Sequence, residues 1–465
     1  MRSVFKSGLV LAAAAPAAIL AGGFLYLSAS ATSPSFLHYD LTLKDGDLNI
    51  LQVQGHVFGA AGRNTSITAP AGGFEKIQPL NFTARDSEGG LLEVDNENGG
   101  WTVHNGRKDF TYAYEVVLTI EDRYSPDIKG MLSMLNVDRC RIFGRDIFIA
   151  PDDGCPGRVI VDVGIFPEYD IRSEWPTVGG RMIVADANRL PLTVFVSGNY
   201  RYIESDVMGT EIGLAIAGDW SFEDDELLFV IKRIVSKEIA LFGSSPHRKH
   251  LFICDANPVR GGRGFDYYGV HFAGCIVLLL DPAIDGSDLF DTQMSIIAHE
   301  FFHNWNGEAI RPDSDDFLWF VEGATVYYSY MVLLSLDIIT ESQYESKRET
   351  IASRYMNNPY LNEVPVGSAA NVDLSDKDMV NLLYDGGFLV SESLDRKVRE
   401  LTDGRNGLID VLKYMYDNAD EWNGVDDDVL IESINRVCGH DLSRFLQVLV
   451  REPAPELPLE NHVSS

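Results

Sequence analysis

Short runs in which apolar and polar residues alternate fill the first part of the chain, from about residue 36 to residue 202. A period of two is typical of strands that bury one face, and the Gly, Asn, Asp and Pro residues between the runs favour turns. Helical periodicity is scarce here. The pattern predicts a β-rich domain arranged as an antiparallel sandwich, with strands over 39–43, 48–53, 112–120, 146–150, 158–166 and 192–198.

After about residue 205 the period changes to that of helices. The stretch 223–242 places its apolar residues on one helical face, and its acidic start suits the positive end of a helix dipole. Two strand-like runs follow, at 250–256 and 275–281. This order of elements predicts a multidomain α+β fold with a boundary near residue 205, and with further helices over 292–304, 318–336, 382–401, 408–418 and 427–437.

The first 31 residues resemble a targeting segment rather than part of a folded domain. Arg2 and Lys6 precede an apolar stretch over 8–27, and Ala29-Ser30-Ala31 offers a cleavage site. The pattern predicts a secretory signal. The alternative is an uncleaved anchor, because about 20 apolar residues can span a bilayer. Either way we expect an exported protein, periplasmic or extracellular, that meets the membrane only through this segment.

Composition excludes several kinds of partner. The chain has 465 residues, and 38 Lys and Arg against 69 Asp and Glu give a formal net charge of −31. We expect no nucleic-acid partner, since phosphate binding needs a basic face. The five cysteines lack C-x-x-C spacing, which argues against a thiolate zinc cluster. Two interpretations of the cysteines stay open: disulfides between Cys140 and Cys155 and between Cys254 and Cys275, or buried free thiols.

The predicted helix 292–304 carries the motif HEFFH at 299–303. Histidines at i and i+4 lie on one helical face, so His299 and His303 can bind one Zn²⁺ ion. Glu300 can reach a water bound to that ion and act as general base. The alternative is a surface helix with two solvated histidines, but that predicts polar flanks and these flanks are apolar.

A catalytic zinc ion needs a third protein ligand. Glu322 lies in an apolar run, where an unpaired carboxylate is costly and a metal removes the cost. Tyr384 could donate a hydrogen bond to a developing oxyanion, although a packing role is the simpler interpretation of a lone tyrosine. The other histidines, such as His104 and His440, show no second ligand at metal spacing, and we interpret them as ordinary polar residues.

Together these segments resemble the glycyl aminopeptidase family, which belongs to the thermolysin-like (gluzincin) zinc metallopeptidases. The resemblance covers residues 206–450 well and extends weakly to FGRDIFIAP at 143–151. It rests on HEFFHNWN (299–306), IRP (310–312), LWFVEG (318–323), T-x-YY (325–328) and YDGG (384–387).

The resemblance implies one zinc ion held by His299, His303 and Glu322, with Glu300 as general base and Tyr384 as oxyanion partner. It also implies a β-rich N-terminal domain, a thermolysin-like catalytic domain and a helical C-terminal part. With the period change, this divides the chain into 1–31 (signal or anchor), 32–205 (β-rich), 206–370 (catalytic), 371–452 (helical) and 453–465 (loose tail).

The chain departs from its relatives near the predicted site. Relatives carry a Glu that holds the substrate's free amine where His271 stands here, so His271 is the predicted substrate-binding position. Glu308-Ala309 replaces a Lys-Arg pair, and Gly386 replaces a Lys. Relatives often continue into a PDZ domain, and we expect none here because the sequence ends at Ser465.

The expected function is that of an exported zinc metallopeptidase that hydrolyses peptides or proteins with a zinc-activated water and the Glu300 base. The altered amine position leaves aminopeptidase and endopeptidase action open. One alternative is a non-catalytic relative, stabilised by zinc, that binds peptides or serves as a scaffold. Another is a hydrolase of a different bond, such as an epoxide.

Overall fold

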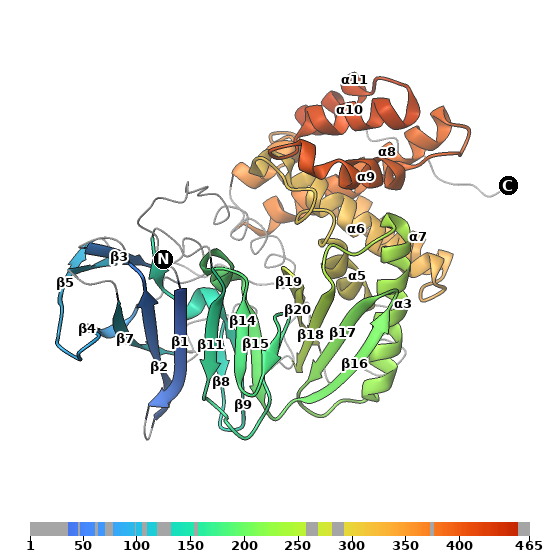
Figure 1. Ribbon diagram of the computed structural model, residues 1–465. Helices are drawn as coiled ribbons and strands as arrows, with labels where there is room; N and C mark the ends of the chain where they lie inside the picture. Colours follow the sequence, from blue (N-terminus) through green and yellow to red (C-terminus); the bar gives the residue numbers. More distant parts are fainter. Residues whose placement is uncertain are drawn as a thin grey trace.

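The computed structural model describes residues 36–44, 47–60, 64–69, 78–97, 99–104, 109–118, 132–152, 157–256, 268–280, 293–372 and 376–453. Strands dominate the first half of the chain, and helices gather at the other end of the molecule (Figure 1). The predicted signal or anchor, residues 1–31, and nearly all of the predicted tail lie outside the described residues.

The largest sheet has seven strands in the order β13-β14-β11-β1-β2-β7-β4. Alternate residues of β1, among them Leu37, Tyr39 and Leu41, are fully buried, as the period of two predicts. One pairing departs from the predicted antiparallel arrangement, because β1 pairs with β11 in parallel. The strands are β1 (Phe36–Lys44), β2 (Asp47–Phe58), β4 (Leu80–Asp86), β7 (Phe110–Val117), β11 (Val159–Val163), β13 (Thr177–Val178) and β14 (Arg181–Val184).

Two four-stranded sheets complete the β-rich half, in the orders β10-β3-β6-β5 and β12-β15-β9-β8. Their strands are β3 (Asn64–Thr68), β5 (Glu93–Glu97), β6 (Gly100–His104), β8 (Met134–Leu135), β9 (Arg139–Phe143), β10 (Ala150–Pro151), β12 (Arg172–Ser173) and β15 (Val194–Gly198).

The prediction of a strand over 146–150 is wrong. The segment begins as a short 3-10 helix, Gly144–Asp146, and only its last residue joins a strand. Ile147 and Ile149 are nevertheless fully buried. Tyrosine hydroxyls take the place of a neighbouring strand, since Tyr114 donates to the Ile147 carbonyl at 2.6 Å and Tyr112 to the Ile149 carbonyl at 2.8 Å. Burial thus gave this segment an apolar pattern without a sheet partner.

A five-stranded sheet follows, in the order β16-β17-β18-β20-β19. One face packs against helices α3 and α5, and the other packs against Phe143, Val194 and Val196 of the β9–β15 sheet. The sheet therefore joins the two halves of the molecule. Its elements are β16 (Arg201–Val207), β17 (Thr210–Ile216), α3 (Asp224–Phe242), β18 (Lys249–Ala256), β19 (Tyr268–Phe272) and β20 (Cys275–Leu280).

The predicted helices are confirmed, although α8 begins five residues before the expected start at 382. Two further helices, α7 and α11, were not predicted. Charged residues are spread around α7, which buries only four side chains. Helix α11 has nine residues with an apolar face, and the sequence analysis missed it. The helices are α5 (Met294–Phe302), α6 (Leu318–Ser335), α7 (Glu341–Met356), α8 (Lys377–Leu401), α9 (Leu408–Asp417), α10 (Asp427–Cys438) and α11 (Ser443–Arg451).

Three further sequence predictions meet the structure here. Cys254 and Cys275 are free, buried thiols rather than a disulfide, whereas Cys155 lies outside the described residues. The domain boundary near residue 205 stays a prediction, and β16 runs across that position to pair with β17. Among the described residues, one helix, Asp315–Ser335, is apolar and long enough to cross a membrane, but 78% of its most apolar window is buried inside the protein, as in a core helix.

Candidate metal centre

Helices α5 and α6 bring two histidines and a glutamate to one point. His299 lies on α5 and His303, four residues later, follows its last residue, and their Nε2 atoms are 3.0 Å apart. Glu322 on α6 places Oε2 at 3.4 Å from His299 Nε2 and at 3.6 Å from His303 Nε2. The three residues predicted as zinc ligands thus converge in one group that could hold a metal ion.

The surroundings of Glu322 fit a cation. Its side chain is fully buried, and neither carboxylate oxygen has a hydrogen-bond partner among the described residues. Burial raises the pKa of Glu322, but His303 and His299 lower it to about 2 overall. Burial lowers the pKa of His303, but Glu322 outweighs burial and raises it to about 9. The cluster therefore attracts positive charge to its centre. Two imidazoles and one carboxylate match a zinc site with three protein ligands.

Asn306 fixes the orientation of the second histidine. His303 Nδ1 lies 2.9 Å from the Asn306 carbonyl oxygen, so Nδ1 carries the proton that it donates and Nε2 faces the cluster. The Asn306 side-chain amide donates to the carbonyls of Phe320 and Val321 at 3.2 and 2.9 Å. This amide ties the end of α5 to the turn of α6 that carries Glu322. The sequence analysis did not identify Asn306.

Glycines let α6 and α8 approach closely enough to place their polar side chains in the site. A Cβ atom on Gly323 would lie 2.1 Å from the Gly387 carbonyl carbon, and one on Gly387 would lie 2.2 Å from the Trp319 carbonyl oxygen. Only glycine fits at such a crossing. The two positions follow Glu322 by one residue and Tyr384 by three, so this contact sets the distance between those side chains.

Glu300 lies beside the cluster and is also buried, with 3% of its surface exposed. Burial raises its pKa to about 8, and a hydrogen bond from the His271 backbone opposes that rise. Strand β19 passes directly over Glu300, since a Cβ atom on Gly269 would lie 2.6 Å from Glu300 Cγ. The Glu300 carboxyl group lies between an edge strand and the group formed by His299, His303 and Glu322. A pKa near neutrality in that position suits proton transfer.

Tyr384 on α8 completes the buried wall of the site. Its ring stacks near His299, with centroids 6.3 Å apart. Its hydroxyl has no hydrogen-bond partner among the described residues. Burial and then the Glu322 charge raise its pKa well above the ordinary value, so the phenol keeps its proton and can donate it in a hydrogen bond. This is the property that the predicted oxyanion role requires.

His271 on β19 lies next to these groups but contacts a different set. Its Nε2 atom is 3.2 Å from Asn304 Oδ1 and 3.4 Å from Glu308 Oε2. Burial lowers its pKa to about 4, against the opposing charge of Glu308, so the ring is neutral near pH 7. Glu308 also pairs with His247 at 2.8 Å. The Glu308 carboxylate thus lies beside His271, the predicted substrate-binding position.

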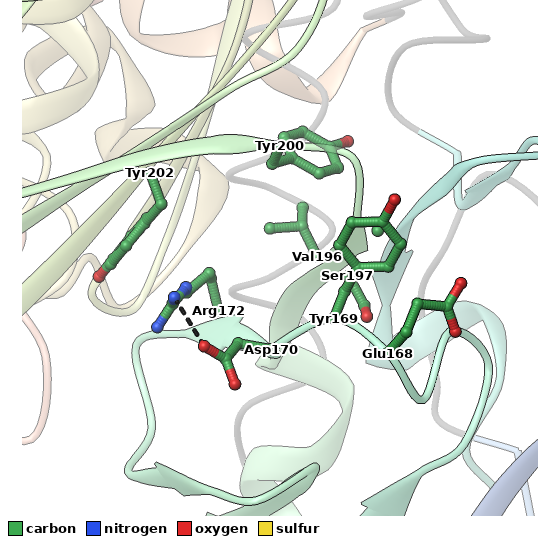
Figure 2. Close-up of a pocket in the computed structure, with 9 residues that line it drawn as sticks. Glu168, Tyr169, Asp170, Arg172, Val196, Ser197, Tyr200 and Tyr202 are labelled. Carbon is green, nitrogen blue, oxygen red and sulfur yellow. Dashed lines mark hydrogen bonds and ion pairs between the residues drawn. The ribbon is translucent and has the colours of Figure 1, made fainter.

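A separate hollow of about 290 Å³ lies where β15 and β16 meet, and none of its lining residues belongs to the histidine cluster. Figure 2 shows its charged and aromatic side chains facing one another. Arg172 pairs with Asp170 at 3.1 Å and lies over the Tyr202 ring at 4.1 Å. The hollow holds no group of potential metal ligands among the described residues, so we assign the chemistry to the buried cluster.

A second group of metal-binding side chains lies on the β-rich half, where sequence reasoning found none. His38, Asp40 and His56 offer ligand atoms that all lie within 4.8 Å of one another. The interpretation of the remaining histidines as ordinary polar residues stays a prediction, but His38 and His56 do have potential ligands beside them. His38 and Asp40 share a face of β1, but His56 joins them only through the β1–β2 register, which spacing along the sequence does not give.

Comparisons with known proteins found one family model and a similar solved structure. Residues 292–381 match the family model of the M61 glycyl aminopeptidases, a span that includes His299, His303 and Glu322 but ends before Tyr384. The crystal structure of an aminopeptidase N family protein from Idiomarina loihiensis is similar, with a TM-score of 0.77 and 19% identity over 90% of this chain and 76% of that chain. This similarity confirms the α+β fold. A search of curated proteins found no match.

Proposed function

We propose that the chain, whose residues 292–381 match the family model of the M61 glycyl aminopeptidases, is a zinc-dependent metallopeptidase with its catalytic centre at His299, His303 and Glu322. The observation that carries this proposal is the convergence of these three buried side chains within 3.0 to 3.6 Å, with Glu300 beside them. A structural metal site has no need of an adjacent base.

When bound, a zinc ion supplies positive charge that acidifies water, polarises a peptide carbonyl and favours the ionised form of a neighbouring carboxyl group. Glu300 then accepts a proton from the attacking water and donates it to the amine nitrogen of the leaving fragment. Tyr384 donates a hydrogen bond to the carbonyl oxygen as negative charge develops on it. Because Glu300 and Tyr384 are buried, little bulk water competes with these contacts.

We propose further that the substrate binds as an extended peptide along β19. This strand lies at the edge of the five-stranded sheet, so one side of its backbone has no partner strand among the described residues. An extended peptide can add to such an edge through backbone hydrogen bonds. Gly269 brings the strand within contact of Glu300, so a peptide on this edge would present a carbonyl carbon close to the proposed base.

The test is a mass-spectrometric digest of a mixed peptide library with free or acetylated N-termini, using purified protein and a Glu300→Gln control. Loss of single residues from free N-termini would show an aminopeptidase. Internal cuts that ignore acetylation would show an endopeptidase, with His271 no longer a site for a substrate amine. The absence of any cleavage that depends on Glu300 would contradict the proposal and favour the non-catalytic, peptide-binding alternative.

The sequence pattern of residues 1–31 supports a separate part of the proposal, that the protein is exported to the periplasm or the extracellular space. Intact-mass analysis of the protein made in its own host tests this part. A mature N-terminus close to Ala31 would support a cleaved signal, an intact N-terminus in the membrane fraction would support the anchor, and recovery of the uncut chain from the cytosol would contradict export.

A further inference from the structure

Three neighbouring strands of the seven-stranded sheet bring histidines and carboxylates together on one face. His38 and Asp40 are two residues apart on β1 and lie on its outward side. His56 on β2 lies directly opposite His38, and Asp162 on β11 lies directly opposite Asp40. Side chains directly opposite one another on adjacent strands have Cβ atoms about 5 Å apart. This register brings His38, Asp40 and His56 into one group of potential ligands, with Asp162 at its edge.

The ligand atoms converge as they do around a metal ion. His56 Nε2 lies 2.8 Å from Asp40 Oδ2, and His38 Nε2 lies 3.6 Å from Asp40 Oδ1 and 2.8 Å from Asp162 Oδ2. Zinc ligands about 2.0–2.1 Å from the ion stand about 3.3 Å apart in a tetrahedron. The 3.6 Å separation lies within the range of the buried cluster, 3.0 to 3.6 Å, and the two separations of 2.8 Å are shorter.

The formal charges of the group favour a cation. Arg181 on β14 donates to both oxygens of Asp162, at 2.6 and 2.8 Å. Asp162 thus lies between Arg181 and His38, at the edge of the group. Two carboxylates and one guanidinium leave the group with net negative charge when both histidines are neutral, which is their form as metal ligands.

The chemistry of the donors selects the kind of ion. Imidazole nitrogens suit zinc and its neighbours among the transition metals, whereas Ca²⁺ and Mg²⁺ prefer oxygen ligands. On one side, the Phe36 and Phe58 rings pack 5.5 Å apart, and the Phe58 ring stacks on His56 at 6.5 Å. All three potential ligands are accessible to solvent, since the side chains of His38, Asp40 and His56 are between 22% and 40% exposed.

We propose that His38, Asp40 and His56 form a second zinc site that ties β1 to β2. The site has no nearby base comparable to Glu300, so we assign it a structural role. The ion would cross-link two antiparallel strands at the position where His38 lies opposite His56.

The competing explanation is that each histidine simply hydrogen-bonds to an aspartate. The same domain provides a matched control for this explanation. His104 on β6 lies 2.7 Å from Asp95 in an exposed pair and also contacts Asn64, but it is not part of any metal-binding group found in the described residues. Replacing a histidine that only forms such a pair should leave the metal content of the protein unchanged.

The experiment measures zinc bound per chain by elemental mass spectrometry. Metal-free full-length protein is incubated with a small excess of zinc chloride and then desalted. Wild type should hold two zinc ions, His56→Gln and Asp40→Asn one each, and His104→Gln two. His299→Ala should also hold one, because it loses only the ion of the buried cluster. Circular dichroism verifies that each variant is folded, and the two variants of the sheet site guard against misfolding of either one.

The result that would overturn the proposal is a single zinc ion in wild type that disappears in His299→Ala and survives in His56→Gln. Two ions in both His56→Gln and Asp40→Asn would overturn it as well, because they would place the second ion elsewhere. One ion in wild type that disappears in His56→Gln and survives in His299→Ala would instead support the sheet site and contradict the proposed catalytic centre. The two proposals therefore fail separately.

Discussion

The molecule holds two clusters with nearly the same ligands, one between helices and one on a sheet. His299, His303 and Glu322 are at most 5% exposed, and Glu300 and Tyr384 line the same site. The side chains of His38, Asp40 and His56 are 22% to 40% exposed. Strands β1 and β2 lie well apart from α5 and α6 in Figure 1, so the clusters do not share a site.

The difference teaches that ligand identity does not decide what a bound ion does. In the buried cluster, low solvent access and neighbouring charges shift the pKa values of Glu300, His303 and Glu322. Burial and these charges suit Glu300 to accept a proton and Tyr384 to donate a hydrogen bond. On the sheet, an arginine and two phenylalanines surround the ligands. The His38, Asp40 and His56 side chains could hold an ion there, but these neighbours offer no proton acceptor.

The largest expected effect is the contrast between Glu322→Gln and Asp40→Asn, which make the same chemical change in the two clusters. Glu322→Gln should lose the zinc ion of the buried cluster and lower peptide hydrolysis by at least about 10³-fold, since the proton-transfer and electrostatic contributions at that site are lost together. Asp40→Asn should lose one zinc ion and keep its activity. Rate measurements with zinc analysis check both variants, and equal losses of activity would contradict the distinction.

The next largest effect concerns Tyr384. Tyr384→Phe removes only the hydroxyl that is proposed to donate to the developing oxyanion, and loss of such a donor costs about 10²–10³-fold in kcat. KM and zinc content should change little, because the ring and the ligands remain. Steady-state kinetics with a peptide substrate provide the measurement. A raised KM with unchanged kcat would show that Tyr384 serves binding rather than catalysis.

A smaller effect is expected from Gly387→Ala, which tests how the helices position the buried cluster. The added methyl group collides with the Trp319 carbonyl, so α6 and α8 must separate, at a cost of about 1–3 kcal/mol. Ser391→Ala in the same helix is the control, because its buried hydroxyl has no hydrogen-bond partner among the described residues. Urea unfolding followed by tryptophan fluorescence compares them, and equal midpoints would contradict the close approach.

The smallest effect is a pH dependence of the stabilisation by zinc. Without metal, the raised pKa of His303, about 9 against an ordinary 6.5, gives stability that is full below pH 6.5 and is lost as pH rises through 9. The lowered pKa of Glu322, about 2 against 4.5, gives stability that is lost only as pH falls toward 2. Zinc must displace the His303 proton, so its binding should strengthen by up to about tenfold per pH unit from 6.5 to 9.

Calorimetry in the His56→Gln background isolates this dependence to the buried cluster. The difference in melting temperature between zinc-loaded and chelator-treated protein should grow by a few degrees between pH 6 and pH 9. A difference that stays constant or shrinks over this range would contradict the proton competition at His303.

Much of the buried cluster could be predicted from the sequence because its residues lie on helices close together in the chain. The spacing of His299 and His303 alone places both on one face, and the apolar flanks of Glu322 indicate its burial. The sheet cluster could not be predicted in this way. Its histidines meet only through strand register, and a shift of one residue would turn every side chain of β2 to the opposite face.

The fold shows the same limit. Periodicity predicted the strands and helices that bury one face, but it failed at 146–150, where tyrosine hydroxyls replace a strand partner, and at α7, whose face is largely charged. The parallel pairing of β1 with β11 joins segments more than 100 residues apart, and no local pattern encodes it. Long-range contacts of this kind determine where Asp162 lies.

The most direct test of the catalytic assignment is peptide hydrolysis by Glu300→Gln with its zinc content measured on the same sample. Glutamine preserves the shape of the side chain but cannot accept the proton. We predict the same zinc content as wild type and a loss of turnover of about 10²–10⁴-fold, the range that general-base catalysis supplies. Turnover close to that of wild type, at unchanged zinc content, would contradict the assignment of Glu300 as the base and with it the proposed catalytic centre.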